Sequence, residues 1–478
     1  VKTVDEEMIA TANRGELYGE NNLLYLIGDA RLVSPEYVVW ADTISAIDGD
    51  DKGEAFGNVK IVDPEASSVV TGDHALFSRE AGFAEVDQSP FLISREQGTS
   101  ELNATAKLMR FFKDDQRVVM VDSVKIRQGK SIAVADTAWI NSREQMILRG
   151  NPLIDDGTGS TMRGTEIEFV YLNNEIDRII LKGDASVFDV APDSLAAIYH
   201  GLPSANKLSG DTITVYMKDG EPDHSVVLGQ AQSIYVPIDN PDEIASNDVL
   251  GDTITIYFKN KKVETVDVVG NMSGVYSFVR LDEQDPDSLQ TVDFNSTKEN
   301  VVYSGHQAEF KLGQRTILFD GNAVLDYGSM NLAAGHIRLD TDSRELYASE
   351  SPLLIDGSQK IAGGNMAYNF GHKSSAVLDA VTMMEDYYYV GEKIKRFDNG
   401  DLKINSGKMT SCDHAEPHYH FWSDKMKIKM KDKVFAQPVV IKVGKVPLFA
   451  LPFYFKNMES GRKSGILFPS FNFGWSQR

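Results

Sequence analysis

The stretch Gly210-Asp211-Thr212-Ile213-Thr214-Val215-Tyr216 recurs almost unchanged as Gly251-Asp252-Thr253-Ile254-Thr255-Ile256-Tyr257. Each copy alternates apolar and polar residues, which is typical of a half-buried β-strand. Each is followed by a charged turn and a second apolar step, at Val226-Val227-Leu228-Gly229 and at Val268-Val269-Gly270. The sequence therefore predicts β-hairpins that repeat along the chain.

A looser repeat extends over the rest of the chain. Its copies begin at Asn58-Val59-Lys60-Ile61, Ser123-Val124-Lys125-Ile126 and Asn322-Ala323-Val324-Leu325, and each leads to a proline followed by an apolar run. Helical periodicity is scarce. Stacked β repeats of this size build a solenoid, a propeller or an open jellyroll, and unequal repeats fit the equal blades of a propeller poorly. We predict an all-β fold, an elongated open β-jellyroll made of stacked repeats.

Composition limits the classes of function. The chain has 478 residues and a formal net charge of −22, which argues against a nucleic-acid partner because phosphate affinity comes from Lys and Arg. A single cysteine excludes an internal disulfide. The sequence contains no run of about eighteen apolar residues, so no membrane-spanning helix is predicted. Its first residues do not resemble a signal peptide.

Charge is unevenly distributed. Ten basic residues lie between Ser423 and Lys463, and only Asp424, Asp432 and Glu459 oppose them. Such a strip beside an apolar terminus suits an anionic lipid surface. A solvated strand face explains it equally well, because Lys425 to Lys433 occupy every second position.

Three motifs follow one another near the end of the chain. Ser411-Cys412-Asp413-His414-Ala415-Glu416-Pro417-His418-Tyr419-His420-Phe421 comes first, then Val446-Pro447-Leu448-Phe449-Ala450-Leu451-Pro452-Phe453-Tyr454-Phe455, then Ser460-Gly461-Arg462-Lys463-Ser464-Gly465-Ile466-Leu467-Phe468-Pro469. This ordered set resembles the family of LPS-assembly outer-membrane proteins (LptD, also called OstA or organic solvent tolerance proteins).

The resemblance implies a periplasmic jellyroll that ends at the first strand of a large transmembrane β-barrel, the rest of which is missing here. We expect the first part of an OstA-like jellyroll at 1–188, repeated β-hairpin units at 189–290, the last part of the jellyroll at 291–459, and a linker with the first barrel strand at 460–478. In this family cysteines near Cys412 pair with cysteines at the end of the barrel. We interpret the chain as a piece of a longer protein, in which Cys412 is either free or forms an interdomain or intermolecular disulfide.

An apolar groove is the main candidate site. Alternation places several large apolar side chains on one face of each strand, where they could bury acyl chains at about 25 cal/mol per Å². The predicted lining residues are Ile167, Phe169, Ile213, Val215, Ile254, Ile256, Phe258, Met366, Tyr368 and Phe370. From the pattern alone, an ordinary dry sandwich core fits the same residues; the family resemblance favours the groove.

Prolines define a second candidate site. Proline cannot complete a central ladder, so Pro447, Pro452 and Pro469 would weaken strand pairing near the barrel entry. We predict a lateral gate there, through which an amphiphile could leave sideways.

Other chemistry finds little support in the sequence. Cys412, Asp413, His414, His418 and His420 have zinc-like spacing, but Pro417 interrupts the set and we predict no metal site. No nucleophile elbow, P-loop or zinc-protease motif is present. We predict that the protein is not an enzyme and uses no cofactor.

The expected function is lipopolysaccharide transport and assembly at the periplasmic face of the outer membrane. The expected partners are lipopolysaccharide or a related amphiphile, a periplasmic bridge protein of similar fold that joins by edge-strand addition, and an outer-membrane lipoprotein plug. Two alternatives remain open: a periplasmic bridge or lipid-binding protein without a barrel, and a β-solenoid enzyme acting on carbohydrate.

Overall fold

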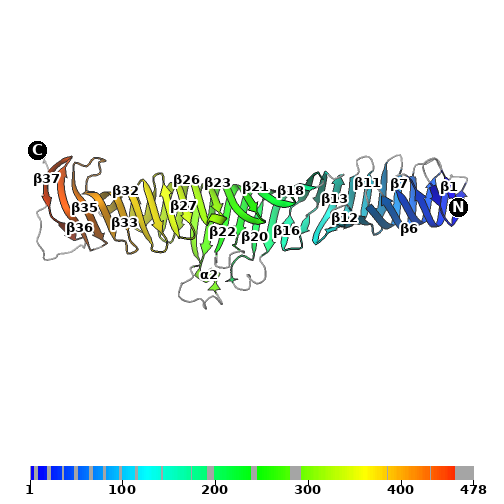
Figure 1. Ribbon diagram of the computed structural model, residues 1–478, viewed down its shortest axis with the longest axis horizontal. Coiled ribbons are helices and arrows are strands. Elements are labelled where there is room, and N and C mark those ends of the chain that lie inside the picture. The colour runs from blue at the N-terminus through cyan, green and yellow to red at the C-terminus, as the bar shows by residue number, and fades with distance from the viewer. Residues whose placement is uncertain are drawn as a thin grey trace, which may run out of the picture. The chain divides into compact units, whose positions relative to one another are not determined.

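The computed structural model describes most of the chain, and its elements are shown in Figure 1. The described residues are 2–4, 9–18, 23–34, 37–47, 52–63, 68–78, 82–95, 100–112, 117–141, 144–173, 175–190, 199–237, 245–279, 292–384, 386–430 and 432–457.

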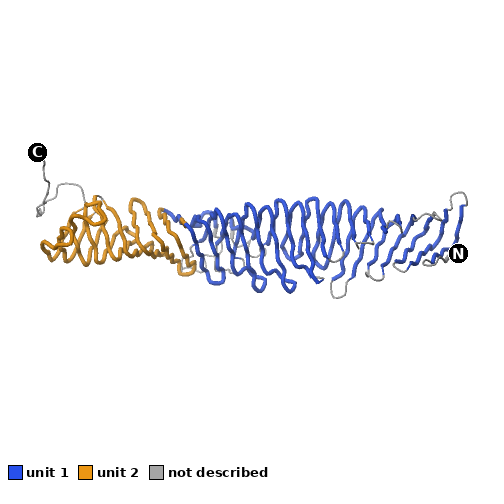
Figure 2. Tube along the Cα trace, turned by 90° about the horizontal axis from the view of Figure 1, so that it is seen from above, with its two compact units in different colours: residues 1–321, 325–328 blue, residues 322–324, 329–478 orange. Residues whose placement is uncertain are grey.

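Two compact units make up the chain, coloured separately in Figure 2. Unit 1 comprises residues 1–321 and 325–328, and unit 2 comprises residues 322–324 and 329–478. The finer division predicted at 188 and 290 stays a prediction.

Strands dominate both units. The elements up to residue 278 are β1 (Lys2–Val4), β2 (Ile9–Thr11), β3 (Arg14–Tyr18), β4 (Leu23–Val33), β5 (Val38–Ile47), β6 (Lys52–Asp63), β7 (Ser68–Ser78), β8 (Phe83–Asp87), β9 (Phe91–Ser94), β10 (Leu102–Thr105), β11 (Leu108–Phe112), β12 (Arg117–Gln128), β13 (Ser131–Asn141), β14 (Gln145–Arg149), β15 (Leu153–Asp155), β16 (Ser160–Arg163), β17 (Glu166–Leu172), β18 (Glu175–Val190), β19 (Tyr199–His200), β20 (Ala205–Lys218), β21 (Glu221–Tyr235), β22 (Ala245–Lys259) and β23 (Lys262–Phe278).

The remaining elements continue the same pattern. They are β24 (Val292–Asp293), α2 (Phe294–Thr297), β25 (Glu299–Lys311), the 3-10 turn η2 (Leu312–Gln314), β26 (Thr316–Tyr327), β27 (Met330–Asp340), β28 (Glu345–Ser349), β29 (Leu353–Asp356), β30 (Gln359–Ala362), β31 (Asn365–Asn369), β32 (Ser374–Met384), β33 (Tyr387–Arg396), β34 (Leu402–Thr410), β35 (Tyr419–Lys429), β36 (Lys433–Val443), β37 (Val446–Leu451) and β38 (Tyr454–Asn457).

Long strands fold over at a corner near their middle. In β23 the corner is Gly270 and Asn271, with φ of 81° and 46°. The antiparallel register between β22 and β23 shifts across these two residues, as it does at the equivalent corner in β21. The corner divides each long strand into two arms, and shorter strands such as β14 and β15 pair with one arm each.

The Gly-Asp start of the repeated sequence lies at this corner and explains it. A Cβ on Gly251 would stand 2.5 Å from Cγ1 of Val268, so a larger residue here would clash with the valine side chain. The carboxylate of Asp252 accepts hydrogen bonds of 3.1 and 3.3 Å from the side-chain amide of Asn271. Glycine therefore permits the fold-over, and aspartate holds the left-handed corner of the next strand.

A small satellite lies beside the stack of unit 1. Strands β19 and β24 pair in parallel, and α2 follows β24 directly (Figure 1). Phe294 of α2 is 2% exposed and packs against Leu202 and Val279. This cluster buries the one large apolar side chain of α2.

The fold prediction is confirmed. Both units are built of stacked antiparallel hairpins that fold over at repeated corners, as an all-β jellyroll requires. No helix in the described part of the chain is long and apolar enough to cross a membrane. The predicted first barrel strand, at 460–478, lies outside the described residues.

Candidate functional site

A continuous row of buried apolar side chains runs through unit 1. Its members lie directly opposite one another across successive strands, and none is more than 3% exposed. In strand-pairing order they are Leu26, Ile44, Ala55, Ala75, Val86, Met109, Met120, Ala138, Leu148, Ile167, Leu181, Ile213, Val227, Ile254, Val268 and Ala308. We call this the central row.

The predicted lining residues of unit 1 belong to this interior. Ile167, Ile213 and Ile254 are members of the central row. Phe169, Val215 and Ile256 lie two residues farther from the corner, in a parallel row of inward-facing side chains. These six predicted residues thus lie on the buried face of their strands, and strand register aligns them; their role in binding a lipid stays a prediction.

Exposure rises with distance from the corner along β20 and β22. In β20 it is 0% at Ile213 and 7% at Val215, and Met217 is half-buried. In β22 it is 0% at Ile254 and 7% at Ile256, and the predicted Phe258 is half-buried. This gradient is what two arms produce when they are tightly packed at the corner and less covered toward the hairpin turns.

Unit 2 has an interior row of the same kind. Met366 is 3% exposed and stands in a row with Ile337, Ala348, Val377, Ile394, Ile404, Met426 and Ala436. Tyr368 lies in the adjacent row, and its ring meets that of Phe370 edge-on at 5.1 Å. Both rings are 3% exposed, so all three predicted residues of unit 2 are buried.

A buried polar cluster interrupts the interior of unit 2. Arg396 stands in the row of Tyr368, between Ser375 and Leu402. Its guanidinium lies 2.5 Å from the carboxylate of Asp356, and the two side chains are 9% and 12% exposed. Its Nε donates to Oε1 of Gln359 at 2.8 Å.

This cluster joins the two arms of unit 2. Arg396 belongs to the arm in which β33 pairs with residues 375–378 of β32. Asp356 and Gln359 belong to β29 and β30, which pair with the other arms of β27 and β32. The cluster was not predicted from the sequence, although alternation in Lys393-Ile394-Lys395-Arg396 puts Arg396 on the same face as the buried Ile394.

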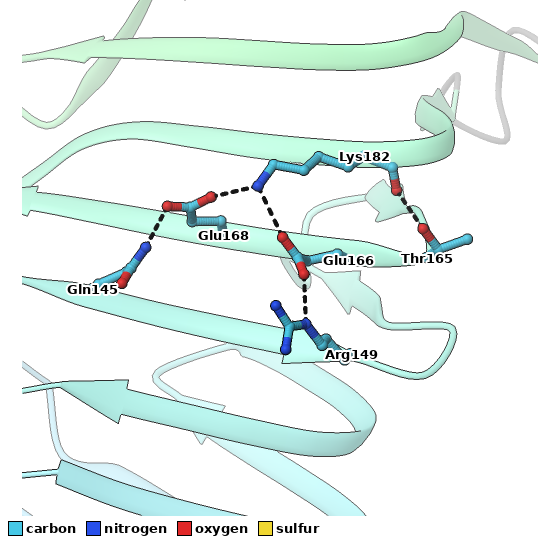
Figure 3. A network of polar contacts seen from close by, with 6 residues as sticks. All are labelled: Gln145, Arg149, Thr165, Glu166, Glu168 and Lys182. Carbon is cyan, nitrogen blue, oxygen red and sulfur yellow. Dashed lines mark hydrogen bonds and ion pairs between the residues drawn. The ribbon is translucent and has the colours of Figure 1, made fainter.

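The outer face opposite Ile167 and Phe169 is polar and charge-balanced (Figure 3). The Lys182 ammonium donates to Glu166 and to Glu168, each at 2.8 Å. Arg149 donates to Glu166 at 2.5 Å. The hydrogen bond from Lys182 is the main cause that holds the pKa of each glutamate below its usual value, and the hydrogen bond from Glu166 is the main cause that raises the pKa of Lys182.

Replacing Lys182 by methionine is expected to lower the free energy of unfolding by about 1 kcal/mol at pH 7, a value discounted because the lysine is partly exposed. The contribution of Glu166 and Glu168 to stability is fully present above the pKa that they have in the unfolded chain. It is lost as pH falls through the lowered pKa that they have in the folded protein. The difference between the variant and the parent should therefore shrink in acid. Denaturant titrations at several pH values measure it.

Lys259→Met is the matched control, because Lys259 bonds Glu264 at 3.0 Å with side chains 68% and 48% exposed. It should change stability by less than about 0.5 kcal/mol. Equal losses in the two variants would contradict a specific role for the Lys182 network.

Cys412 is a free, half-buried cysteine whose Sγ lies 3.3 Å from Nδ1 of His418. The His414 ring meets the His418 ring edge-on at 4.9 Å. His420 is 6% exposed, and burial is the main cause that lowers its pKa. The described residues contain no group of three or more side chains placed to hold a metal ion. The disulfide predicted for Cys412 stays a prediction.

The gate prolines occupy the last described strands or lie beyond them. Pro447 is in β37, where the register with β36 shifts between Ile441 and Lys442. Pro452 lies between β37 and β38 and is exposed. Pro469 is outside the described residues. The gate role of all three stays a prediction.

Comparison with known proteins gives relatives of a single name. The chain is 20% identical over 161 residues to the LPS-assembly protein LptD of Saccharophagus degradans, covering 33% of this chain and 19% of that protein. It is 25% identical over 160 residues to the LptD of Xanthomonas campestris pv. campestris, covering 32% and 19%. For the LptD of Idiomarina loihiensis the identity is 18% over 186 residues, covering 38% and 25%.

No protein-family model matches the chain. Among solved structures, the LptA-homologous periplasmic protein LptH of Pseudomonas aeruginosa matches 28% of this chain and 75% of its own, at 11% identity and a TM-score of 0.16. The chain spans about a fifth of the length of the first two curated relatives. The family resemblance expected from the sequence is thus confirmed: over about a third of its length, this chain is similar to LPS-assembly proteins named LptD.

Proposed function

We propose that the chain is the periplasmic jellyroll of an LPS-assembly outer-membrane protein and that it carries lipopolysaccharide, or a related amphiphile, between its two arms. The observation that carries this proposal is the exposure gradient along the interior rows, from 0% at Ile213 and Ile254 to half-buried at Met217 and Phe258. The similarity to LptD proteins supports it.

The two parts of the interior would serve different purposes. The central row packs the corner and keeps the arms together, because apolar surface at 0% exposure has no area left to offer a ligand. The half-buried side chains near the hairpin turns would contact acyl chains, while the phosphorylated headgroup stays in water. The protein itself would break no bond and need no cofactor.

The edge strands of the stack are where we expect partner proteins to bind. Strand edges that carry no neighbour accept a further strand by backbone hydrogen bonding. In the described residues β3 pairs only with β4, and it exposes Leu17 and Tyr18 by 68% and 53%. We assign this end to a bridge protein of similar fold. The proposal also includes a barrel for outer-membrane insertion and its lipoprotein plug. It places the gate at Pro447, Pro452 and Pro469.

Photo-crosslinking tests the groove. A benzoylphenylalanine at Phe258 or Met217 is expected to crosslink lipopolysaccharide in cells, because both side chains are half-buried on the interior face. Tyr257, which neighbours Phe258 and is 42% exposed, is the matched outward position. Thr212 and Thr253 provide further outward controls. Labelling from Tyr257 as strong as from Phe258 would remove the groove from the proposal.

A further inference from the structure

A lysine-rich outer face covers one arm of unit 2. Strand register places Lys395, Lys403 and Lys427 directly opposite one another on β33, β34 and β35. The same row continues to Phe435 on β36 and Phe455 on β38. These aromatic side chains are 42% and 45% exposed.

Neighbouring positions on this arm add more positive charge. Lys393 stands opposite Asn405, which stands opposite Lys425, and Lys429 stands opposite Lys433. We call the seven lysines and two phenylalanines the lysine face: Lys393, Lys395, Lys403, Lys425, Lys427, Lys429, Lys433, Phe435 and Phe455.

Carboxylates lie only at the margins of this face. Glu392 and Asp424 are exposed near the corner. Asp398, Asp401 and Asp432 lie in turns at the other end of the arm, with Asp432 3.8 Å from Lys433. The rows themselves pass through no acidic residue in the described strands β31 to β36. The central lysines of the face, Lys395, Lys403 and Lys427, therefore have no acidic neighbour across the strands.

This arrangement costs stability in the free protein. Adjacent strands are about 4.8 Å apart, and like charges placed directly opposite destabilise a sheet. The outer face of unit 1 shows the usual solution, in which Lys182 lies between Glu166 and Glu168. A chain with 70 acidic and 48 basic residues has carboxylates available for the same purpose in unit 2, yet this face has none.

We propose that the lysine face docks on the surface of an anionic phospholipid bilayer. Lipid phosphates would neutralise the opposed ammonium groups, and Phe435 and Phe455 would enter the interface beside them. A flat array of headgroups matches an arm of a β-sheet, and the net charge of −22 disfavours approach of a free polyanion. The inference rests on the outer face alone and is independent of the groove.

Vesicle co-sedimentation of the whole chain tests the proposal. Binding to phosphatidylglycerol vesicles should exceed binding to phosphatidylcholine vesicles and weaken as salt rises. The variant Lys395→Gln/Lys403→Gln/Lys427→Gln should lower the partition coefficient by roughly 100-fold, because each lysine near an anionic surface contributes about a fivefold factor. The variant Phe435→Ser/Phe455→Ser should also bind more weakly. Its binding should keep more of the salt dependence than the binding of the triple lysine variant does.

Matched controls separate this face from total charge. Lys125→Gln/Lys130→Gln/Lys218→Gln removes the same charge from exposed positions of unit 1 and should leave vesicle binding within about twofold, since distant exposed charges are screened. Equal binding to both kinds of vesicle, or equal loss in the two triple variants, overturns the proposal. So does binding to duplex DNA without binding to vesicles.

Discussion

Replacing Ile254 by aspartate is expected to lower the free energy of unfolding of unit 1 by about 3 to 5 kcal/mol, the usual cost of an uncompensated buried charge. The side chain is 0% exposed and lies between Val227 and Val268 in the central row. Stacked repeats contact chiefly their neighbours, so the damage should be concentrated in β21 to β23. Amide hydrogen exchange of these strands measures it.

Leu250→Asp is the control on the same strand. Leu250 is 48% exposed, and its replacement should change stability by less than about 0.5 kcal/mol, as surface substitutions usually do. Comparable loss of protection in the two variants would show that the central row is not the packing core of unit 1.

Strand alternation was sufficient to predict which face of each hairpin is buried. Ile213 and Ile254 were recognised from their repeated sequence, and both are in the central row. The same sequence contained Gly251 and Asp252, but their role could not be derived from it. The corner depends on Val268 and Asn271 of the next strand, and which residues face each other across strands is set by register.

Residues brought together by strand register could not be predicted from the sequence, whereas patterns within a single strand could. The alternating lysines of β35 were visible as a strip from Lys425 onward, whereas Lys395 and Lys403 join them only through pairing between strands. Arg396 gave a local signal, because it shares parity with Ile394. Its partner Asp356 is forty residues away, and only the folding of the two arms brings it near.

The second large effect on stability is expected at the Arg396–Asp356 ion pair. Arg396→Met is expected to lower the free energy of unfolding of unit 2 by about 3 kcal/mol, because it leaves the carboxylate of Asp356 buried without its cation. It also removes the donor to Gln359. Chemical denaturation followed by circular dichroism, with hydrogen exchange of β29 and β33, measures the loss.

A double variant distinguishes charge from packing. Arg396→Met/Asp356→Leu leaves no buried charge, so it should be more stable than Arg396→Met alone, although Asp356 also accepts a hydrogen bond from Ser329. Lys395→Met, one residue away on the lysine face, should cost nothing or add stability by relieving repulsion from Lys403. If Lys395→Met proved as damaging as Arg396→Met, the ion pair would not be what holds the two arms of unit 2 together.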